Sequence, residues 1–423
     1  MKIVIVGAGI SGLATYLFLK KHLPFPNSHE IRIYEKRHIS RPQGAGIGVS
    51  ANGVQVLKDL GVLEKVLRDG SVCRSFSIHG ANGWPIANLR TGRCAHEFCV
   101  SITRHALWKV LMTETGDVVS YGEVRDVERD TNTGRILVHL EDSVVETDLV
   151  IGADGIHSIV REHLLGPDKF SPRHSGYAWV GGCMDITAYP ELQERKDAMH
   201  FAVGKDGIFS YSAGGQHLLT WLSIFPKQDP SSSNSKYLLG PREQWKDPVV
   251  QNIISKAGPG RVYDIMTVPK LPTWGERGIV LVGDSAHAMS PTTGQGVSQN
   301  LEDAQTLALL LSVTTTKCHA EEKNGRLTPD AIDRSLLLYY HIRHERVERI
   351  AATGEAFGKH MLNANPLAVY VGYCLLWALN KFTGIITRRS KSLNDQLYGW
   401  DAEGSVRSAI HTNHVLEIKP GDQ

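Results

Sequence analysis

The sequence has 423 residues, which is enough for two or three domains with a large hydrophobic core. The 46 Lys and Arg residues nearly balance 44 Asp and Glu residues, and basic residues are not grouped with aromatic ones, so we expect no nucleic-acid partner. The six cysteines show no metal-binding spacing such as C-x-x-C, so we expect reduced thiols and no metal site: Cys73, Cys94, Cys99, Cys183, Cys318 and Cys374.

Two features of the ends of the chain bear on its location. The first predicted strand starts at Lys2, which leaves no room for a signal peptide, and we expect a cytoplasmic protein. Pro366–Leu379 is strongly apolar but shorter than the roughly 20 residues of a membrane-spanning helix. Two interpretations of this segment are open: a packed terminal helix, or a helix that contacts a membrane surface or a partner and makes the protein peripheral to a membrane.

The N-terminal residues have the order of elements that a dinucleotide-binding site requires. Lys2–Val6 predicts a short buried strand, and the G-x-G-x-x-G loop Gly7-Ala8-Gly9-Ile10-Ser11-Gly12 follows at once. Apolar residues then recur at helical spacing, and a second strand over Glu30–Tyr34 ends at Glu35. The alternative, a glycine-rich turn in an ordinary α/β unit, does not require this whole order.

The glycines and the acid each have a physical use in such a site. Gly7 permits a tight turn, Gly9 lets the backbone approach a pyrophosphate, and Gly12 lets the helix pack on the strand. Free N–H groups and the helix dipole face the phosphates. Glu35 lies 23 residues after Gly12, near the roughly 20 expected for the acid that binds the adenosine ribose. Its carboxylate would repel a 2′-phosphate, so we expect the adenosine of FAD or NAD, and not that of NADP.

The next elements are predicted from hydrophobic periodicity and turn residues. A second glycine-rich loop, Arg41–Gly48, precedes short helices over Asn52–Leu60 and Val62–Asp69. A hairpin with its turn at Asn82-Gly83 and a helix capped by Thr103 follow. Four strands are then expected, over 118–121, 123–129, 135–141 and 144–151.

The second half of the chain changes character and then returns to the first pattern. Short alternating segments from Tyr177 to Val268 predict an antiparallel sheet. The buried-strand pattern returns at Gly278–Val282, and an apolar helix follows Gly296. Ala331–Ala352 is predicted as a charged amphipathic helix. This order indicates an α/β protein with an antiparallel sheet inserted into it.

Three separated segments carry a resemblance to a known family. They are Gly7–Gly12 with Glu35, then Gly152-Ala153-Asp154-Gly155-Ile156-His157-Ser158 with Arg161, and last Gly283-Asp284-Ser285-Ala286-His287 through Pro291 and Gly294-Gln295-Gly296 to Glu302-Asp303-Ala304. Over residues 1–350 the chain thereby resembles the single-component, FAD-dependent aromatic hydroxylases of the salicylate and para-hydroxybenzoate hydroxylase group (group A flavin monooxygenases). Among members of the group, the fungal enzymes of secondary metabolism are the most similar to this sequence in general character.

The resemblance implies an α/β fold with a Rossmann-like FAD-binding domain, an antiparallel-sheet substrate domain and a C-terminal helical segment. The expected FAD-binding domain covers residues 1–175 and is completed by 276–350. The substrate-binding sheet would cover 176–275, and the C-terminal helical segment and tail would cover 351–423.

The resemblance implies roles for residues of the first two segments. The three loop glycines would hold the FAD pyrophosphate and Glu35 the adenosine ribose, while Gly46 would pass close to the flavin. Arg104 matches a helix-initial arginine that contacts FAD; the alternative is an exposed helix arginine. Asp154 and Arg161 match a segment that serves FAD and the transient nicotinamide cofactor; the alternative is a strand-turn-helix held by an aspartate cap.

The third segment is expected at the flavin itself. Asp284 would accept hydrogen bonds from the ribityl hydroxyls, and Pro291 would pack beside the flavin where oxygen reacts. Gly294, Gly296 and Val297 belong to a loop entering a helix N-terminus that faces flavin N1, where N–H donors and the helix dipole stabilise a reduced, anionic flavin. His287 is expected to be structural and not a base.

The implied reaction has two stages. NADPH or NADH transfers hydride to FAD, and the reduced flavin reacts with O2 to give a C4a-hydroperoxide that hydroxylates a small aromatic or alkaloid-like substrate. The first alternative is epoxidation of a terpenoid or meroterpenoid alkene, and the second is a flavin-binding interaction module that does not oxygenate. The choice between NADH and NADPH, the substrate and the oligomeric state are left open.

The substrate sheet departs from the family pattern at one of two positions. Val180 stands where members of the group often have an arginine, while Tyr211 keeps the tyrosine found about thirty residues later. The pair is proposed to hold a phenolate in fungal relatives, and Val180 cannot pair with an anion, so a neutral or more apolar substrate is favoured. Tyr211 is the candidate catalytic residue; the alternative is a core tyrosine.

Overall fold

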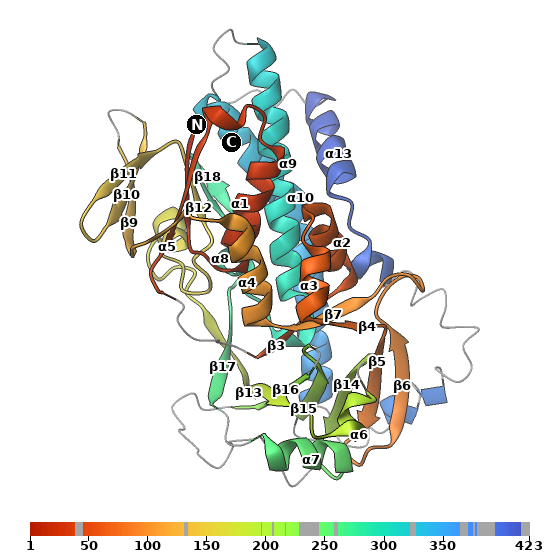
Figure 1. Ribbon diagram of the computed structural model, residues 1–423. Coiled ribbons are helices and arrows are strands. Elements are labelled where there is room, and N and C mark those ends of the chain that lie inside the picture. The colour runs from red at the N-terminus through yellow and green to blue at the C-terminus, as the bar shows by residue number, and fades with distance from the viewer. Residues whose placement is uncertain are drawn as a thin grey trace.

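The computed structural model describes residues 1–38, 45–130, 134–195, 197–204, 207–215, 217–227, 245–257, 261–321, 327–363, 371–374, 377–378 and 394–415. Two large sheets and a group of long helices dominate this part of the chain (Figure 1). One sheet lies alongside the helices and the other lies beyond one end of them (Figure 1). Together they confirm the predicted α/β class.

Six strands form a mostly parallel sheet that includes the first strand of the chain. All adjacent pairs are parallel except β18 with β19. The central strand is buried along most of its length because both faces of such a sheet are covered. In spatial order the strands are β18 (Gly275–Glu276), β19 (Ile279–Leu281), β12 (Leu149–Gly152), β1 (Lys2–Val6), β2 (Glu30–Glu35) and β8 (Val119–Tyr121).

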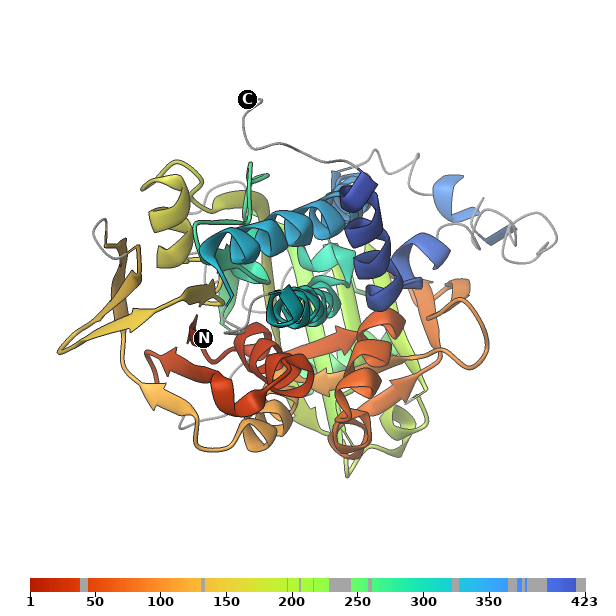
Figure 2. The same cartoon turned by 90° about the horizontal axis from the view of Figure 1, so that it is seen from above.

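Helices pack around this sheet, and α9 is the most enclosed of them. Figure 2 shows α9 almost end-on between α1 and α10. The expected apolar face is confirmed, because Leu301, Ala304 and Leu307 are fully buried. The predicted helix over 331–352 is part of a longer one. The helices are α1 (Ile10–His22), α4 (Arg104–Thr115), α5 (Ile159–Leu165), α8 (Asp284–His287), α9 (Gly296–Glu321), α10 (Pro329–Asn363) and α13 (Ala402–Val415).

Seven strands form the second large sheet, which is antiparallel as expected except where β14 runs parallel to β5. The predicted hairpin around Asn82-Gly83 is confirmed as β5 and β6, and it extends this sheet from residues far earlier in the chain. The domain boundary at 175/176 stays a prediction. The strands in order are β17 (Val262–Thr267), β13 (Arg173–Asp185), β16 (Leu218–Pro226), β15 (Gly207–Ala213), β14 (Ala198–Gly204), β5 (Ser75–Gly80) and β6 (Pro85–Arg90).

The predicted strand over 144–151 is wrong in one respect, because it is two strands in different sheets. β11 (Val144–Thr147) pairs with β10 (Ile136–Leu140), which also pairs with β9 (Val124–Arg129), while β12 joins the six-stranded sheet. Asp148 stands at the break. Its carboxylate accepts a hydrogen bond from the Lys2 amide at 2.7 Å and pairs with Arg135 at 2.8 Å, so the polar residue fixes the corner.

A small sheet, with β7 in its middle, connects the two large ones. The predicted helices α2 and α3 begin within one residue of their expected positions. The expected cap is also confirmed, since Thr103 Oγ1 accepts a hydrogen bond from the Ala106 amide at 3.1 Å at the start of α4. The elements here are β3 (Gly46–Val49), α2 (Ala51–Leu60), α3 (Leu63–Asp69), β4 (Ser71–Cys73) and β7 (Cys99–Thr103).

The seven-stranded sheet has two unlike faces. Phe209, Tyr211 and Trp221 point to one face, where they pack into a buried apolar cluster with α7 (Pro248–Lys256) and α6 (Pro190–Gln193). We call this the α7 face. The packed side chains of this cluster fill the space between the sheet and α7.

The other face of the sheet turns toward β3 and β7. Thr220 lies where a side chain at Gly46 of β3 would have to go, and Ser212 Oγ lies 2.7 Å from Ser101 Oγ of β7. We call this the β3 face. Because side chains alternate along a strand, Ser212 and Thr220 point away from Tyr211 and Trp221.

The apolar segment 366–379 lies largely outside the described residues. Of it, only 371–374 and 377–378 are described. Within the described parts of the chain, no helix is both long enough and apolar enough to span a bilayer.

Candidate cofactor site and substrate face

The first glycine-rich loop is shaped by packing at two of its three glycines. Gly7 has φ +103°, and a Cβ there would lie 2.5 Å from the carbonyl oxygen of Ala153. A Cβ at Gly12 would collide with the carbonyl oxygen of Gly7. Gly9 has an extended backbone with φ −74°, and no described atom lies within 4 Å of a Cβ built there. Protein packing therefore explains Gly7 and Gly12 but leaves the backbone at Gly9 open to a ligand.

Glu35 ends β2 beside this loop, as its spacing predicts. Its Oε2 accepts a hydrogen bond from the Ala8 amide at 2.8 Å, and its Oε1 accepts one from the Arg37 amide at 3.1 Å. The indole of Trp108 in α4 donates to the Ala8 carbonyl at 2.9 Å. The loop is thus held from both sides, with an acidic side chain at its edge.

The second segment joins β12 to α5 and is held by an aspartate cap. Asp154 Oδ2 accepts hydrogen bonds from the Ile159 and Val160 amides at 2.9 and 3.3 Å. Its other oxygen, Oδ1, is buried and has no hydrogen-bond partner in the described part of the chain, and burial raises the pKa of the carboxyl. The cap interpretation describes the contacts of Oδ2. The unpartnered Oδ1 fits a hydroxyl donor of a cofactor.

Arg161 ties this segment to the third one. Its buried guanidinium donates to the carbonyls of Ser285 and Ile156 at 2.9 and 2.7 Å. These contacts give Arg161 a structural role between α5 and α8. No ligand contact is needed to explain its position.

The third segment runs from β19 through α8 and a 3-10 turn, η4 (Pro291–Thr293), into α9. Asp284 is exposed, and one of its oxygens accepts a hydrogen bond from Asn300 at 3.2 Å. Pro291 is exposed as well. Gly294 has φ +60°, and neither it nor Gly296 has a described atom within 4 Å of a Cβ built there. The first amides of α9, including that of Val297, lack partners inside the helix and can bind negative charge.

Arg104 and Gly46 lie where β3 and β7 approach the loops. Arg104 is an exposed first residue of α4, and its amide donates to the Ala45 carbonyl at 3.2 Å. No described side chain pairs with its guanidinium. Gly46 pairs with Thr103 across the sheet, and Thr220 occupies the space of its missing side chain. The rest of the loop, residues 39–44, lies outside the described residues.

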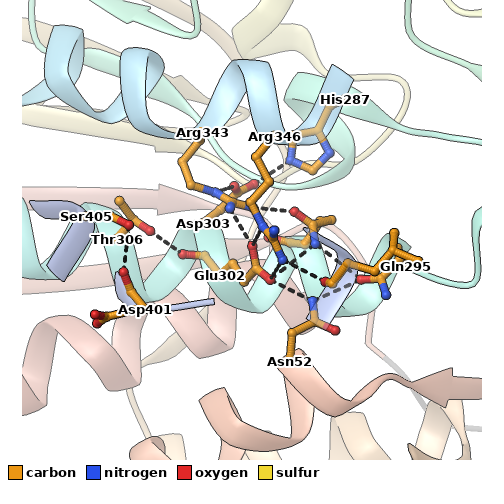
Figure 3. A network of polar contacts seen from close by, with 12 residues as sticks. Asn52, His287, Gln295, Glu302, Asp303, Thr306, Arg343, Arg346, Asp401 and Ser405 are labelled. Atoms are coloured by element: carbon orange, nitrogen blue, oxygen red, sulfur yellow. Dashed lines mark hydrogen bonds and ion pairs between the residues drawn. The ribbon is translucent and has the colours of Figure 1, made fainter. Parts of the chain in front are cut away.

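A buried ion network, which the sequence reading missed, holds the third segment in place (Figure 3). The Arg343 guanidinium of α10 donates to Asp303 at 2.9 Å and to Glu302 at 2.5 Å, and all three side chains are fully buried. Arg346 makes two further bonds to Glu302, at 2.8 and 2.9 Å. His287 Nε2 lies 2.5 Å from Asp303, which agrees with its expected structural role.

The network reaches the backbone of the cofactor loops. Asp303 Oδ2 accepts the Gly283 amide at 2.9 Å, directly before Asp284. Asn52 of α2 donates to Gln295 at 2.9 Å and to Glu302 at 2.6 Å. A signal was present in the sequence: two adjacent acids inside an apolar helix need buried cations.

The side chains of the substrate sheet are arranged differently from expectation. Tyr211 is buried on the α7 face, stacks on His200 and accepts a hydrogen bond from Arg195 at 3.2 Å. Burial raises the pKa of Tyr211 to about 12. Val180 is fully buried on the same face. The structure does not bring Tyr211 to the cofactor loops, so its contacts are those of the core-tyrosine alternative.

Over β14, β15 and β16, the β3 face carries three rows of side chains in register. The near and far rows are only 4–6 % exposed, whereas the middle row is half-buried and therefore accessible between them. Consecutive rows are about 7 Å apart, since they are two residues apart along each strand. The near row is Ser212 and Thr220, the middle row is Phe201, Ser210 and Leu222, and the far row is Val203, Ile208 and Ile224.

Comparisons with known proteins agree with this geometry. A family model described as an FAD binding domain matches residues 1–323. Similar curated proteins include a 3-amino-4-hydroxybenzoate 2-monooxygenase from Streptomyces cremeus, 29% identical over 73% of this chain and 77% of that protein. A zeaxanthin epoxidase from Spinacia oleracea is 29% identical over 82% of this chain and 52% of its own length. A salicylate hydroxylase structure shares the fold, with a TM-score of 0.76, 20% identity and coverage of 97% and 98% of the two chains.

Gly9→Val separates cofactor binding from folding. Gly9 has room for a side chain in the protein, so the variant should fold with unchanged thermal stability of the apoprotein. The added methyl groups would block approach to the backbone, so FAD content after purification should fall at least about tenfold. Absorbance at flavin wavelengths and thermal unfolding measure both. Gly12→Ala, which forces a clash with Gly7, should instead lower stability; equal FAD content in Gly9→Val and the native protein would contradict the assignment.

Asp303→Asn should lower the free energy of unfolding and make it depend less on pH in the acid range. Burial opposes the charge of Asp303, but His287 and Arg343 outweigh it and hold the pKa of this carboxyl below its ordinary value of 3.8. The charged form therefore stabilises the fold above about pH 4, and this contribution is lost as the pH falls through the lower folded pKa.

We expect Asp303→Asn to lower the free energy of unfolding at pH 7 by about 3 kcal/mol. The loss of stability between pH 5 and 3 should also be smaller than in the native protein, as urea unfolding at each pH can test. The exposed Asp142→Asn is the control and should stay within about 0.5 kcal/mol at pH 7. Equal stability of the two variants would show that the network does not hold the fold.

Proposed function

The chain belongs to the family described by the FAD binding domain, and on that premise we propose that it is an FAD-dependent monooxygenase that inserts one oxygen atom of O2 into a small aromatic or alkaloid-like compound. NADH or NADPH is the proposed reductant. The curated relatives that carry monooxygenase names support this reaction class. The structure supports it through the arrangement of the loops.

The single observation that carries the proposal is the convergence of three loops. β1, β12 and β19 are adjacent and parallel, so the loops after their carboxyl ends meet at one edge of the sheet. Arg161 then ties the second loop to the third through a buried contact with Ser285, and Asp303 holds the third loop at Gly283. This edge combines open glycine backbone, helix N-termini and carboxylates, which are the groups that bind a dinucleotide.

Residues of the three segments can be assigned to successive parts of FAD, from the pyrophosphate and ribose to the flavin ring. We assign the pyrophosphate to Gly7, Gly9 and Gly12 and the ribose to Glu35. Asp154 adds an unpartnered buried acceptor. Around the flavin the proposed contacts are Gly46, Arg104, Asp284, Pro291, Gly294, Gly296 and Val297.

When bound, FAD supplies hydride acceptance from NADH or NADPH and activation of O2. The protein would bind and orient the cofactor and the substrate and shield them from water. The amides at the start of α9 would stabilise negative charge on the cofactor ring without reorganising. The middle row of the β3 face, Phe201, Ser210 and Leu222, would form an apolar floor for the substrate and exclude water from it.

Epoxidation of an alkene is the second candidate, and two observations favour it. Zeaxanthin epoxidase is among the relatives, and the chain spans about half of its length. The floor also carries two apolar side chains, which suit a terpenoid. Both reactions use the same cofactor, so the product decides between them.

The test is incubation of the FAD-loaded protein with NADH or NADPH under 18O2, using salicylate, 2-naphthol and zeaxanthin as probes. We expect one 18O atom in the product of at least one probe, detected by mass spectrometry, with NMR separating a phenol from an epoxide. A protein that binds FAD and consumes O2 without labelling any product would contradict the monooxygenase and favour a module that does not oxygenate.

We also propose that the protein is cytoplasmic and contacts a membrane surface through its C-terminal apolar segment. Trp377 of this segment and Trp84 of the β5–β6 hairpin are 38% and 43% exposed, with ring centroids 6.0 Å apart. Tryptophan favours the interface between lipid and water. The protein should co-sediment with phosphatidylcholine vesicles, and Trp84→Ala should reduce the bound fraction. Identical sedimentation of the two proteins, or none by either, would contradict the contact.

A further inference from the structure

Tyr373 places an unusual hydroxyl beside the β3 face. The residue belongs to the chain after α10, and its ring packs against the far row, next to Val203, Ile208 and Ile224. Its hydroxyl is buried and has no hydrogen-bond partner among the described residues, although buried hydroxyls are normally satisfied. Burial raises the pKa of Tyr373, so the group is a neutral donor at physiological pH.

The side chain of Tyr373 packs against the same buried cluster as Phe201 and Leu222 of the middle row. The far row, which Tyr373 covers, is one step from the middle row, or about 7 Å along the strands. Ser210, in the centre of the middle row, carries a second hydroxyl and is half-buried. A molecule lying on Phe201 and Leu222 would therefore meet apolar surface and neutral hydroxyl groups.

The three side chains of this floor carry no positive charge, and the cation beside it, Arg261, lies at the start of the edge strand β17 and stacks on Tyr263. The middle row contains no ionisable residue. Arg195 donates to Tyr211 on the α7 face, and Lys227 pairs with Asp264 at 2.8 Å near the edge of the sheet. A carboxylate lying on Phe201 and Leu222 would lose hydration without finding a charged partner in the middle row, which is costly.

We propose that Tyr373 is a positioning residue that donates a hydrogen bond to an uncharged oxygen of the substrate, so that the site selects neutral, largely apolar ring compounds over aromatic carboxylates. This inference rests on the proposed function and narrows its substrate class. It distinguishes the chain from relatives named for a hydroxybenzoate or for salicylate, whose substrates carry a carboxylate. It also moves the substrate-side tyrosine from Tyr211 to Tyr373.

Three naphthalenes of nearly the same shape provide the probes. 2-Acetylnaphthalene offers a neutral acceptor, 2-isopropylnaphthalene offers none, and 2-naphthoate offers a charged one. Their dissociation constants are measured with the FAD-loaded native protein and variants from changes in the flavin absorbance. FAD content and thermal unfolding are recorded for each variant, and the 18O2 assay is run separately, so a failure of the proposed function is seen independently of the probe affinities.

For the native protein we expect 2-acetylnaphthalene to bind about fivefold more tightly than 2-isopropylnaphthalene, the effect of one net hydrogen bond. 2-Naphthoate should bind most weakly. Tyr373→Phe should remove the preference for the acetyl compound and leave the affinity for the isopropyl compound unchanged. A purely structural tyrosine would shift both affinities together, so the ratio isolates the hydrogen bond.

Tyr211→Phe is the matched variant, since it removes a buried hydroxyl from the same sheet on the opposite face. It should keep the fivefold ratio. The proposal is overturned if Tyr373→Phe keeps the ratio, if Tyr211→Phe loses it, if 2-naphthoate binds best, or if neither neutral probe perturbs the flavin at millimolar concentration.

Discussion

The structure depends on two carboxylates buried inside a helix. Glu302 and Asp303 sit in the fully enclosed part of α9, where an unpaired charge would be very costly, and Arg343 and Arg346 of α10 compensate them. The pairing fixes α10 against α9 in one register. Through Gly283 and Asn52 it also fixes the turn before Asp284 and the loop before α9. A buried cluster therefore sets the geometry of the backbone that we assign to the cofactor.

The second constraint is the difference in packing between the two faces of the seven-stranded sheet. The α7 face is closed by tightly packed aromatic residues, so it contributes stability. The β3 face is closed at its near and far rows and accessible between them. A strand that alternates its side chains can thus anchor one residue in the core and present its neighbour to a ligand.

Local features were predicted well because short-range chemistry determines them. The glycine loop, the Thr103 cap and the hairpin at Asn82-Gly83 each follow from a few adjacent residues. The family membership followed from three such segments in order, and the family match agrees with it.

Other features were out of reach of the sequence because they depend on residues distant in the chain. Alternation shows that Tyr211 and Ser210 point to opposite faces, but only the position of α7 decides which face is core. Likewise, the acids of α9 indicate a need for cations without identifying Arg343, and nothing local links Tyr373 to a sheet that ends about a hundred residues earlier. Tyr211 was therefore chosen for its place in a motif, although its contacts are those of a core residue.

The parallel pair of β5 with β14 has a consequence for how the molecule can be assembled. β14 lies inside the seven-stranded sheet only because a hairpin from residues 75–90 covers its outer side. A piece of the chain restricted to 173–267 would expose the backbone donors and acceptors of β14 as a free sheet edge, and such edges recruit strands from other molecules. The substrate sheet is therefore not a separable module. During synthesis the hairpin emerges first and can pair with β14 only after the intervening residues have been made, so the sheet forms from two distant parts of the chain.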